Sequence, residues 1–216
     1  KYNSTFSSKE ELSDFYLSGL ECLNFLRKKR KNYVDKKNWE LLGIEIPILL
    51  PPIESKPGVA LMGFIDVAFR DKRTGRIIFY DLKTSGKGWS KWDKIDRSKT
   101  DQLILYKKYF SVQYGLDINN IDVEFLILRR KIDTDNPFPP KRIQMFKPTQ
   151  GTVALNRTIR EFEQFINHSF VEPGQYNTDA IYPAICGTNS FNCKFCEFNN
   201  ENLCPTNQRM TQLNLV

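Results

Sequence analysis

Blocks of apolar residues with two different spacings run along this chain and predict an α/β fold. Apolar residues at helical spacing predict three long helices, which we expect over residues 7–34, 98–114 and 151–170. Short apolar, β-branched runs predict strands, which we expect over residues 42–50, 61–69, 76–84, 121–128 and 141–147. The order helix, strand, hairpin, helix, strand favours a mixed central sheet flanked by helices.

Charged residues interrupt the two apolar runs of the expected hairpin. Asp66 lies in the first run, and Asp81 and Lys83 lie in the second. The polar segment 71–75 ends in glycine and reads as the turn. Folding the chain at the middle of this turn places Asp66 opposite Asp81, whereas a bulge would shift the register by one residue. Side chains alternate along a strand, so Lys83 shares a face with Asp81.

Two carboxylates directly opposite each other destabilise a sheet unless something neutralises them. A divalent cation removes the repulsion, and carboxylates with a carbonyl oxygen are suitable ligands for Mg²⁺. Such a cation lowers the pKa of water and polarises a phosphoryl oxygen. Lys83 is then placed to orient or deprotonate the water, or to neutralise charge on the phosphate. The alternative is a surface ion pair between Asp81 and Lys83.

Three short motifs follow one another in this part of the chain: residues 63–66 (Gly-Phe-Ile-Asp), 81–85 (Asp-Leu-Lys-Thr-Ser) and 102–106 (Gln-Leu-Ile-Leu-Tyr). Their order and spacing resemble the PD-(D/E)XK nuclease superfamily. The nearest branch is the RecB-like one, which includes nuclease domains of recombination helicases, phage exonucleases and CRISPR adaptation nucleases. The resemblance extends from about residue 44 to residue 106.

This resemblance implies a restriction-endonuclease-like fold and a role for each motif residue. It implies Mg²⁺ or Mn²⁺ at Asp66, Asp81 and the carbonyl oxygen of Leu82. Lys83 would be the catalytic lysine. Two further residues would flank the site and contact the substrate, namely Gln102 and Tyr106.

The sequence departs from the branch at one further metal ligand, a His or Glu on the first helix. The single histidine, His168, is far downstream. Glu21 and Glu45 are the candidates, and we prefer Glu45 because its strand lies beside that of Asp66. The alternatives are that Glu45 is a solvated strand residue, or that the ligand lies upstream of Lys1.

The segment 85–97 joins the second strand of the hairpin to the next helix and mixes glycine, tryptophan and basic residues. Lys87 and Lys91 can neutralise phosphates, while Trp89 and Trp92 offer faces on which unpaired bases stack. We therefore predict a nucleic-acid-facing loop. The alternative is that both tryptophans only anchor the loop to the core.

Four cysteines gather near the end of the chain: Cys186, Cys193, Cys196 and Cys204. A Cys-x-x-Cys places two thiolates on one turn, which suits tetrahedral zinc or an iron–sulfur cluster. The alternative is a chance cluster of reduced thiols. Some RecB-like nucleases hold a [4Fe–4S] cluster with one early cysteine and a later group of three, which Cys193, Cys196 and Cys204 resemble. Cys22, Cys186 or an upstream cysteine would be the fourth ligand.

Composition sets the limits of these expectations. A chain of 216 residues with 40% hydrophobic content can bury one core with an appendage. We expect a nuclease core over residues 1–170 and a metal-stapled, Cys-rich tail over residues 171–216 that packs on it. No run is long enough for a membrane helix and nothing resembles a signal peptide, so we expect an intracellular protein, in the cytoplasm or in the host cytoplasm if viral.

A net charge of +7 favours a polyanionic partner. The expected function is hydrolysis of DNA, single-stranded or at a duplex end, with a recombination or replication protein as a further partner. The resemblance favours an exonuclease over an endonuclease. One alternative is a catalytically silent DNA-binding module on the same fold, and another is a zinc-stapled interaction domain.

Overall fold

The computed structural model describes residues 7–50, 58–172, 174–181, 184–186, 192–194 and 196–210, with the side chains of Gln208 and Met210 excepted. Five strands form one sheet in the order β1-β2-β3-β4-β5. Their bounds are β1 Trp39–Leu50, β2 Leu61–Asp71, β3 Ile77–Ser85, β4 Ile121–Arg129 and β5 Ile143–Phe146. The pair β3–β4 is parallel and the other pairs are antiparallel, so the sheet is mixed, as predicted.

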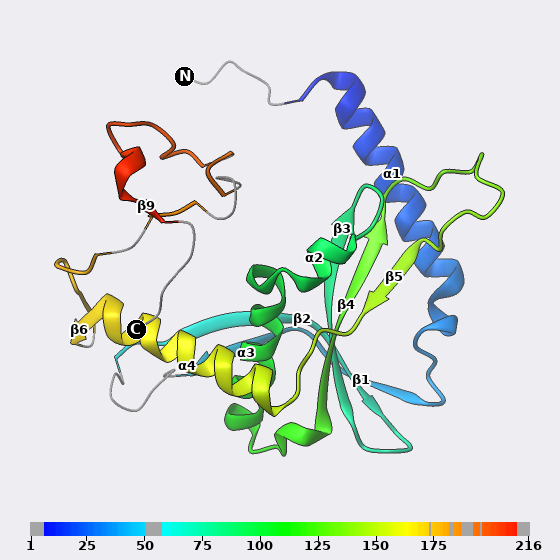
Figure 1. The fold of residues 1–216 in the computed structure, drawn as a ribbon. Helices are drawn as coiled ribbons and strands as arrows, with labels where there is room; N and C mark the ends of the chain where they lie inside the picture. Colours follow the sequence, from blue (N-terminus) through cyan, green and yellow to red (C-terminus); the bar gives the residue numbers. More distant parts are fainter. Residues whose placement is uncertain are drawn as a thin grey trace.

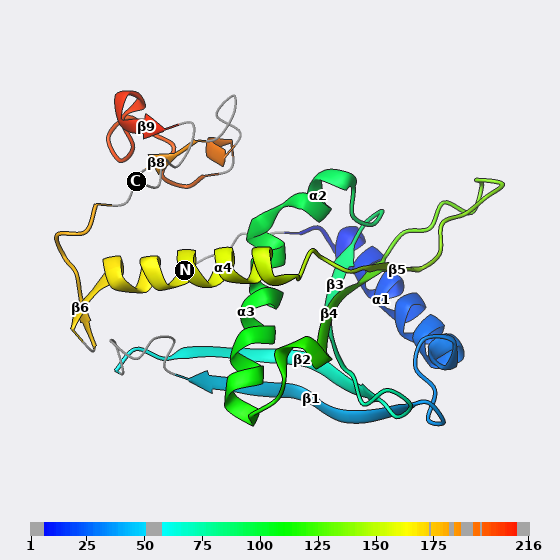
Figure 2. The ribbon, with the colours of Figure 1, turned by 60° about the horizontal axis from the view of Figure 1, so that its bottom comes forward.

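Helices lie on both faces of this sheet (Figures 1 and 2). The α-helices are α1 Lys9–Lys29, α2 Lys91–Ile95, α3 Arg97–Tyr114 and α4 Thr152–Ser169, and the short 3₁₀ helices are η1 Arg30–Asn32, η2 Ile118–Asn120 and η4 Thr206–Gln208. α3 packs on the sheet, and α4 packs across α3 through Tyr109 and Phe162, whose ring centroids are 6.1 Å apart. The α/β class with a helix-flanked mixed sheet is thereby confirmed, while α2 was not predicted.

Alternating residues of β4 explain why both faces are covered. Val123, Phe125 and Ile127 are fully buried in the main core with α3. Leu126 and Leu128 point the other way, into a smaller cluster with the C-terminal half of α1. β5 pairs only with the C-terminal part of β4, from Phe125 to Leu128. At Val123 the Gln150 side chain takes the place of a strand partner, because it donates to the Val123 carbonyl and accepts from the Val123 N–H.

α1 buries few of its side chains. A capping box between Ser8 and Glu11 forms its start. Its buried residues are Ser18 and Cys22. Five apolar residues at helical spacing are between 39% and 66% exposed, namely Leu12, Phe15, Tyr16, Leu20 and Leu23. The part of α1 that joins a described core cluster is its C-terminal half, around Cys22, over the end of β4.

The Cys-rich tail follows α4. Two small strand pairs occur here, made by β6 Phe170–Glu172 with β7 Gln175–Tyr176 and by β8 Ala184–Ile185 with β9 Arg209–Met210. In both views the described part of this segment around β8 and β9 lies beside the C-terminal part of α4 and away from the sheet (Figures 1 and 2). The described residues therefore do not show the expected packing of the tail on the core.

Candidate active site

The hairpin of β2 and β3 sets the geometry of the candidate site. Its pairing runs from Arg70 with Ile77 to Val67 with Tyr80, without a bulge. Continuing this register by one residue places Asp66 opposite Asp81, so the predicted register is confirmed. Beyond Val67 the paired ladder stops. There the Asp66 carboxylate replaces a backbone carbonyl as hydrogen-bond acceptor: it accepts a 2.6 Å hydrogen bond from the backbone N–H of Leu82.

Asp81 is a buried carboxylate with one cationic partner. Its exposed fraction is 4%, and its Oδ2 lies 2.8 Å from Lys83 Nζ. Burial raises the pKa of Asp81, the Lys83 ammonium lowers it, and the nearby charge of Asp66 raises it again. The ion pair of the alternative interpretation is present, but its carboxylate is buried and does not lie on the surface. Perturbed carboxylates of this kind occur more often at functional sites than elsewhere.

The donor set fits a hard divalent cation. Among the described residues, no group donates a hydrogen bond of regular geometry to the buried Oδ2 of Asp81, whose contact is the Lys83 ammonium. In an extended strand, the N–H and C=O of one residue point toward the same neighbouring strand. The carbonyl of Leu82 is thus directed to the side from which Asp66 approaches. Two carboxylates and a carbonyl are oxygen ligands that Mg²⁺ and Mn²⁺ accept.

Among the described residues, no third acid converges on this pair. Glu45 lies opposite Asp66 in the register of β1 with β2, but it is exposed and its φ is 51°. Glu21 is exposed on α1, where its carboxylate pairs with Arg142 at 3.0 Å. Within the part of the chain that the structure describes, no three His, Cys, Asp or Glu side chains converge as a metal site.

Gln102 and Tyr106 lie on one face of α3, as predicted, and they contact each other. Gln102 Nε2 donates to Tyr106 Oη at 2.9 Å. The Tyr106 ring rests on β2 at Gly63, where a Cβ would lie 2.7 Å from Tyr106 Cε1. The glycine of the first motif is thus required by the helix that carries the third motif. Both α3 residues are held within reach of the strand that carries Asp66.

The two tryptophans of the loop have different environments. Trp89 is packed in the core, with ring centroids 4.7 Å from Phe125 and 6.2 Å from Phe146. This packing is the anchoring role that the alternative interpretation described. Trp92 is 67% exposed, and Lys91 Nζ lies 4.8 Å from the centroid of its ring. Lys87 is also exposed.

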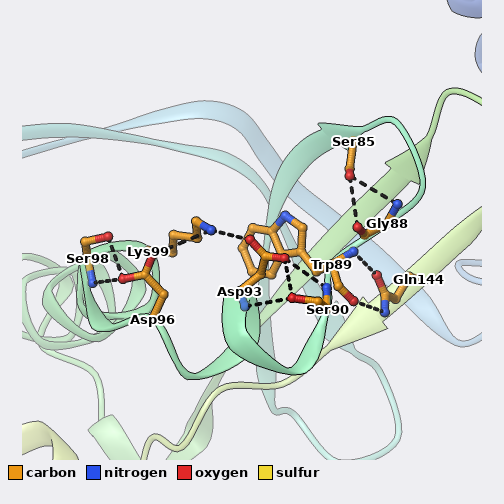
Figure 3. A network of polar contacts seen from close by, with 9 residues as sticks. All are labelled: Ser85, Gly88, Trp89, Ser90, Asp93, Asp96, Ser98, Lys99 and Gln144. Atoms are coloured by element: carbon orange, nitrogen blue, oxygen red, sulfur yellow. Dashed lines mark hydrogen bonds and ion pairs between the residues drawn. The ribbon is translucent and has the colours of Figure 1, made fainter. Parts of the chain in front are cut away.

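A polar network holds the loop in one conformation (Figure 3). The Gln144 side chain accepts from the Trp89 N–H and donates to the Trp89 carbonyl. Asp93 accepts from Lys99 Nζ at 2.6 Å and from Ser90, and these hydrogen bonds lower the pKa of Asp93 to about 2. Sequence analysis missed these residues, although the spacing of Ser90 and Asp93 is that of a capping box.

The four tail cysteines lie in one region, and Cys22 lies elsewhere. Partial burial raises the pKa of the Cys193 thiol; Cys186 raises it further, Arg209 lowers it, and Cys204 and Cys196 raise it. The charges of these thiols therefore influence one another, but among the described residues the cysteines do not converge as a metal site, so the expected metal-stapled tail is not shown. Cys22 is buried under α1, where its Sγ donates to the carbonyl of Arg129 at 3.6 Å. The structure does not bring Cys22 to the tail cysteines.

Comparison of the sequence with models of protein families and with curated proteins finds no match. Among the described helices, none combines the length and the apolar character needed to cross a lipid bilayer.

Proposed function

We propose that this chain is a metal-dependent nuclease that hydrolyses DNA phosphodiester bonds. The observation that carries the proposal is the buried Asp81 carboxylate, held beside Asp66 with the Lys83 ammonium 2.8 Å from its Oδ2. A fold that needed only stability would gain little from two acids at this position, because their desolvation is costly. A preference for exonuclease over endonuclease activity rests on the motif resemblance alone.

Asp66, Asp81 and the Leu82 carbonyl would hold Mg²⁺ or Mn²⁺. When bound, the cation supplies Lewis-acid chemistry, lowering the pKa of water and polarising a phosphoryl oxygen. Asp81 contributes a buried negative charge that water does not screen. Lys83 is 36% exposed at its side chain, so its ammonium reaches from this carboxylate to the surface. At that place it can stabilise charge that develops on a phosphate or orient the attacking water.

Residues around the pair would position the DNA strand. The exposed Trp92 and its neighbour Lys91 offer an aromatic face and a cation on a loop that the Asp93 network holds fixed. Gln102 and Tyr106 present polar atoms from α3. Stacking and phosphate contacts of this kind do not read sequence, so the proposed activity is tolerant of DNA sequence.

The test is degradation of end-labelled single-stranded and duplex DNA with Mg²⁺ and with EDTA. Asp81→Asn and Lys83→Ala should each lower the rate at least 100-fold while DNA binding is retained. The matched controls are Glu40→Gln and Arg70→Ala, which remove an exposed ion pair of the neighbouring strands β1 and β2. These should keep full activity. Cleavage that survives in Asp81→Asn would reject the proposed site, and binding without metal-dependent cleavage would identify a catalytically silent DNA-binding module.

For the tail, we propose that the four cysteines bind a structural metal, either a [4Fe–4S] cluster or Zn²⁺. The support is their spacing in the sequence and the mutual influence of the thiols on the pKa of Cys193. Absorbance in the visible range from anaerobically purified protein would identify the cluster. Colourless protein with one zinc per chain would identify zinc, and protein without either metal would reject the proposal.

A further inference from the structure

A cavity of about 600 Å³ lies where β1 begins and β2 ends. Its walls come from η1, from the turn that follows it, and from the ends of β1 and β2. Both views show the C-terminal end of α1 and the start of β1 meeting at this corner (Figures 1 and 2). The volume lies within the range of small-molecule sites. Nothing in the proposed nuclease mechanism uses it.

Part of the cavity lining is apolar and partly aromatic. We call these residues the floor, namely Trp39, Leu41, Phe69 and Val34. The Trp39 and Phe69 rings meet edge to face, with centroids 6.4 Å apart and an interplanar angle of 77°. Phe69 is supported in turn by the buried Tyr80 behind it. The aromatic floor is therefore fixed by the sheet, and an exposed apolar surface of this shape favours a flat apolar ligand.

The exposed part of the lining is basic, and we call it the rim. It holds four cations that form no ion pair among the described residues, namely Arg30, Lys31, Lys36 and Lys37. The one acid of the rim, Asp35, is occupied by its own turn, because it accepts from the backbone N–H groups of Lys37 and Asn38. Lys72 Nζ donates to the Lys36 carbonyl and so fixes the same turn to the β2–β3 hairpin. The rim therefore carries a net positive charge.

We propose that this cavity binds an unpaired nucleotide, with the base on the apolar floor and the phosphate at the basic rim. An aromatic floor beneath a cationic rim matches a ligand with one flat face and one anionic end. Stacking of a base on such a floor contributes about 1–3 kcal/mol, and the rim neutralises the phosphate. The same chemistry is offered by a free nucleotide and by a nucleotide within a single strand.

The single strand is the source that the charge pattern favours. The last turn of α1 adds Arg27, Lys28 and Lys29, all exposed, directly before the rim. A row of cations of this length can contact several successive phosphates, whereas a free nucleotide needs one or two of them. The choice of a nucleic acid strand rests on the proposed function, but binding in the cavity requires no cleavage.

The experiment measures binding of the full chain to a fluorescein-labelled oligothymidylate of about twelve nucleotides by anisotropy, in EDTA so that no cleavage occurs. Trp39→Leu should weaken binding about tenfold, as expected for the loss of one stacked base. The double variant Lys36→Ala/Lys37→Ala should weaken it and lower the slope of log affinity against log salt by about 1.4. Lys141→Ala/Arg160→Ala removes the same charge from other exposed positions and should leave the slope unchanged.

Competitors identify the occupant. An abasic oligonucleotide with the same phosphates should compete at least fivefold more weakly than oligothymidylate, because the floor recognises the base. Displacement by dTMP at the same nucleotide concentration assigns the site to the free nucleotide, and weaker displacement assigns it to the strand. Equal competition by the abasic strand or by hexaglutamate would overturn the inference, as would unchanged affinity in both cavity variants.

The two proposals fail separately. Unchanged affinity in the cavity variants, with cleavage that depends on Asp81, would remove the nucleotide cavity and leave the nuclease intact. If the unaltered chain does not cleave DNA but the cavity variants bind the oligonucleotide more weakly, the nucleotide cavity stands and the nuclease proposal falls. Asp81→Asn itself should bind the oligothymidylate in EDTA like the unaltered chain.

Discussion

At the scale of single residues, the buried carboxylate of Asp81 opposes stability and serves the proposed site. Burial raises its pKa, so the folded chain holds this proton more tightly than the unfolded chain does. The carboxylate therefore destabilises the fold above its raised pKa. This cost disappears as the pH falls below the ordinary carboxyl pKa near 3.8, where both states are protonated. A bound cation would offset the same cost by favouring the ionised form.

Asp81→Asn should therefore raise the free energy of unfolding at pH 7 by about 1 kcal/mol, because a neutral side chain replaces a desolvated charge while Lys83 remains hydrated. In urea titrations the gain should shrink as the pH falls and vanish below pH 3.8, where both states are protonated. Mg²⁺ should raise the melting temperature of the unaltered chain and leave that of the variant unchanged. A variant that is less stable at pH 7, and that Mg²⁺ still stabilises, would contradict this account.

At the scale of elements, the contact of α3 with β2 depends on the missing side chain of Gly63. An alanine Cβ would lie 2.7 Å from the Tyr106 ring, so Gly63→Ala must displace α3 or the ring. We expect a loss of about 1–3 kcal/mol in stability and a parallel loss of activity. Gly19→Ala is the control, since nothing lies within 4 Å of its Cβ position on α1 and it should stabilise by about 0.5–1 kcal/mol. Equal effects in chemical unfolding would refute the role of this contact.

The loop between β3 and α3 depends on Asp93. Lys99 and Ser90 lower the pKa of Asp93 to about 2, so its ionised form stabilises the folded chain. This contribution is complete above the ordinary carboxyl pKa of 3.8 and is lost as the pH falls through about 2. Asp93→Asn should lower stability at pH 7, and the difference from the unaltered chain should shrink between pH 4 and pH 2. Asp133→Asn, at an exposed position, should show no such trend.

Local patterns predicted the elements that depend on local chemistry. The glycine-ended turn and the apolar runs predicted the hairpin register, and apolar residues at helical spacing predicted α1, α3 and α4. Features that depend on distant residues were beyond prediction. The insertion of the Asp66 carboxylate beside Leu82 requires the strands to separate, and the different roles of Trp89 and Trp92 are decided by Phe125 and Gln144, far along the chain. The exposed apolar residues of α1 have the same helical spacing as a buried face, so spacing alone does not distinguish the two.

At the scale of the whole molecule, the chain is a sheet-and-helix unit followed by a tail of different composition. All three tryptophans lie at positions 39, 89 and 92, in the first of these, and four of the five cysteines lie in the second. The described strands of the tail pair with each other, and Figures 1 and 2 show β8 and β9 away from the sheet. Tryptophan fluorescence therefore reports unfolding of the sheet unit and is insensitive to the tail.

This division predicts that loss of the metal proposed for the tail leaves the stability of the sheet unit unchanged. Cys196→Ser and Cys204→Ser should lower the iron or zinc content per chain and leave the fluorescence-detected melting temperature within about 1 °C, because neither residue contacts the described core. Cys22→Ser is the matched control. Its side chain is buried between α1 and β4, so this variant should keep the metal and melt about 2–4 °C lower, the shift for about 1 kcal/mol in a chain of this size. If the tail variants instead lowered the melting temperature by as much as Cys22→Ser, the tail would be part of the cooperative core.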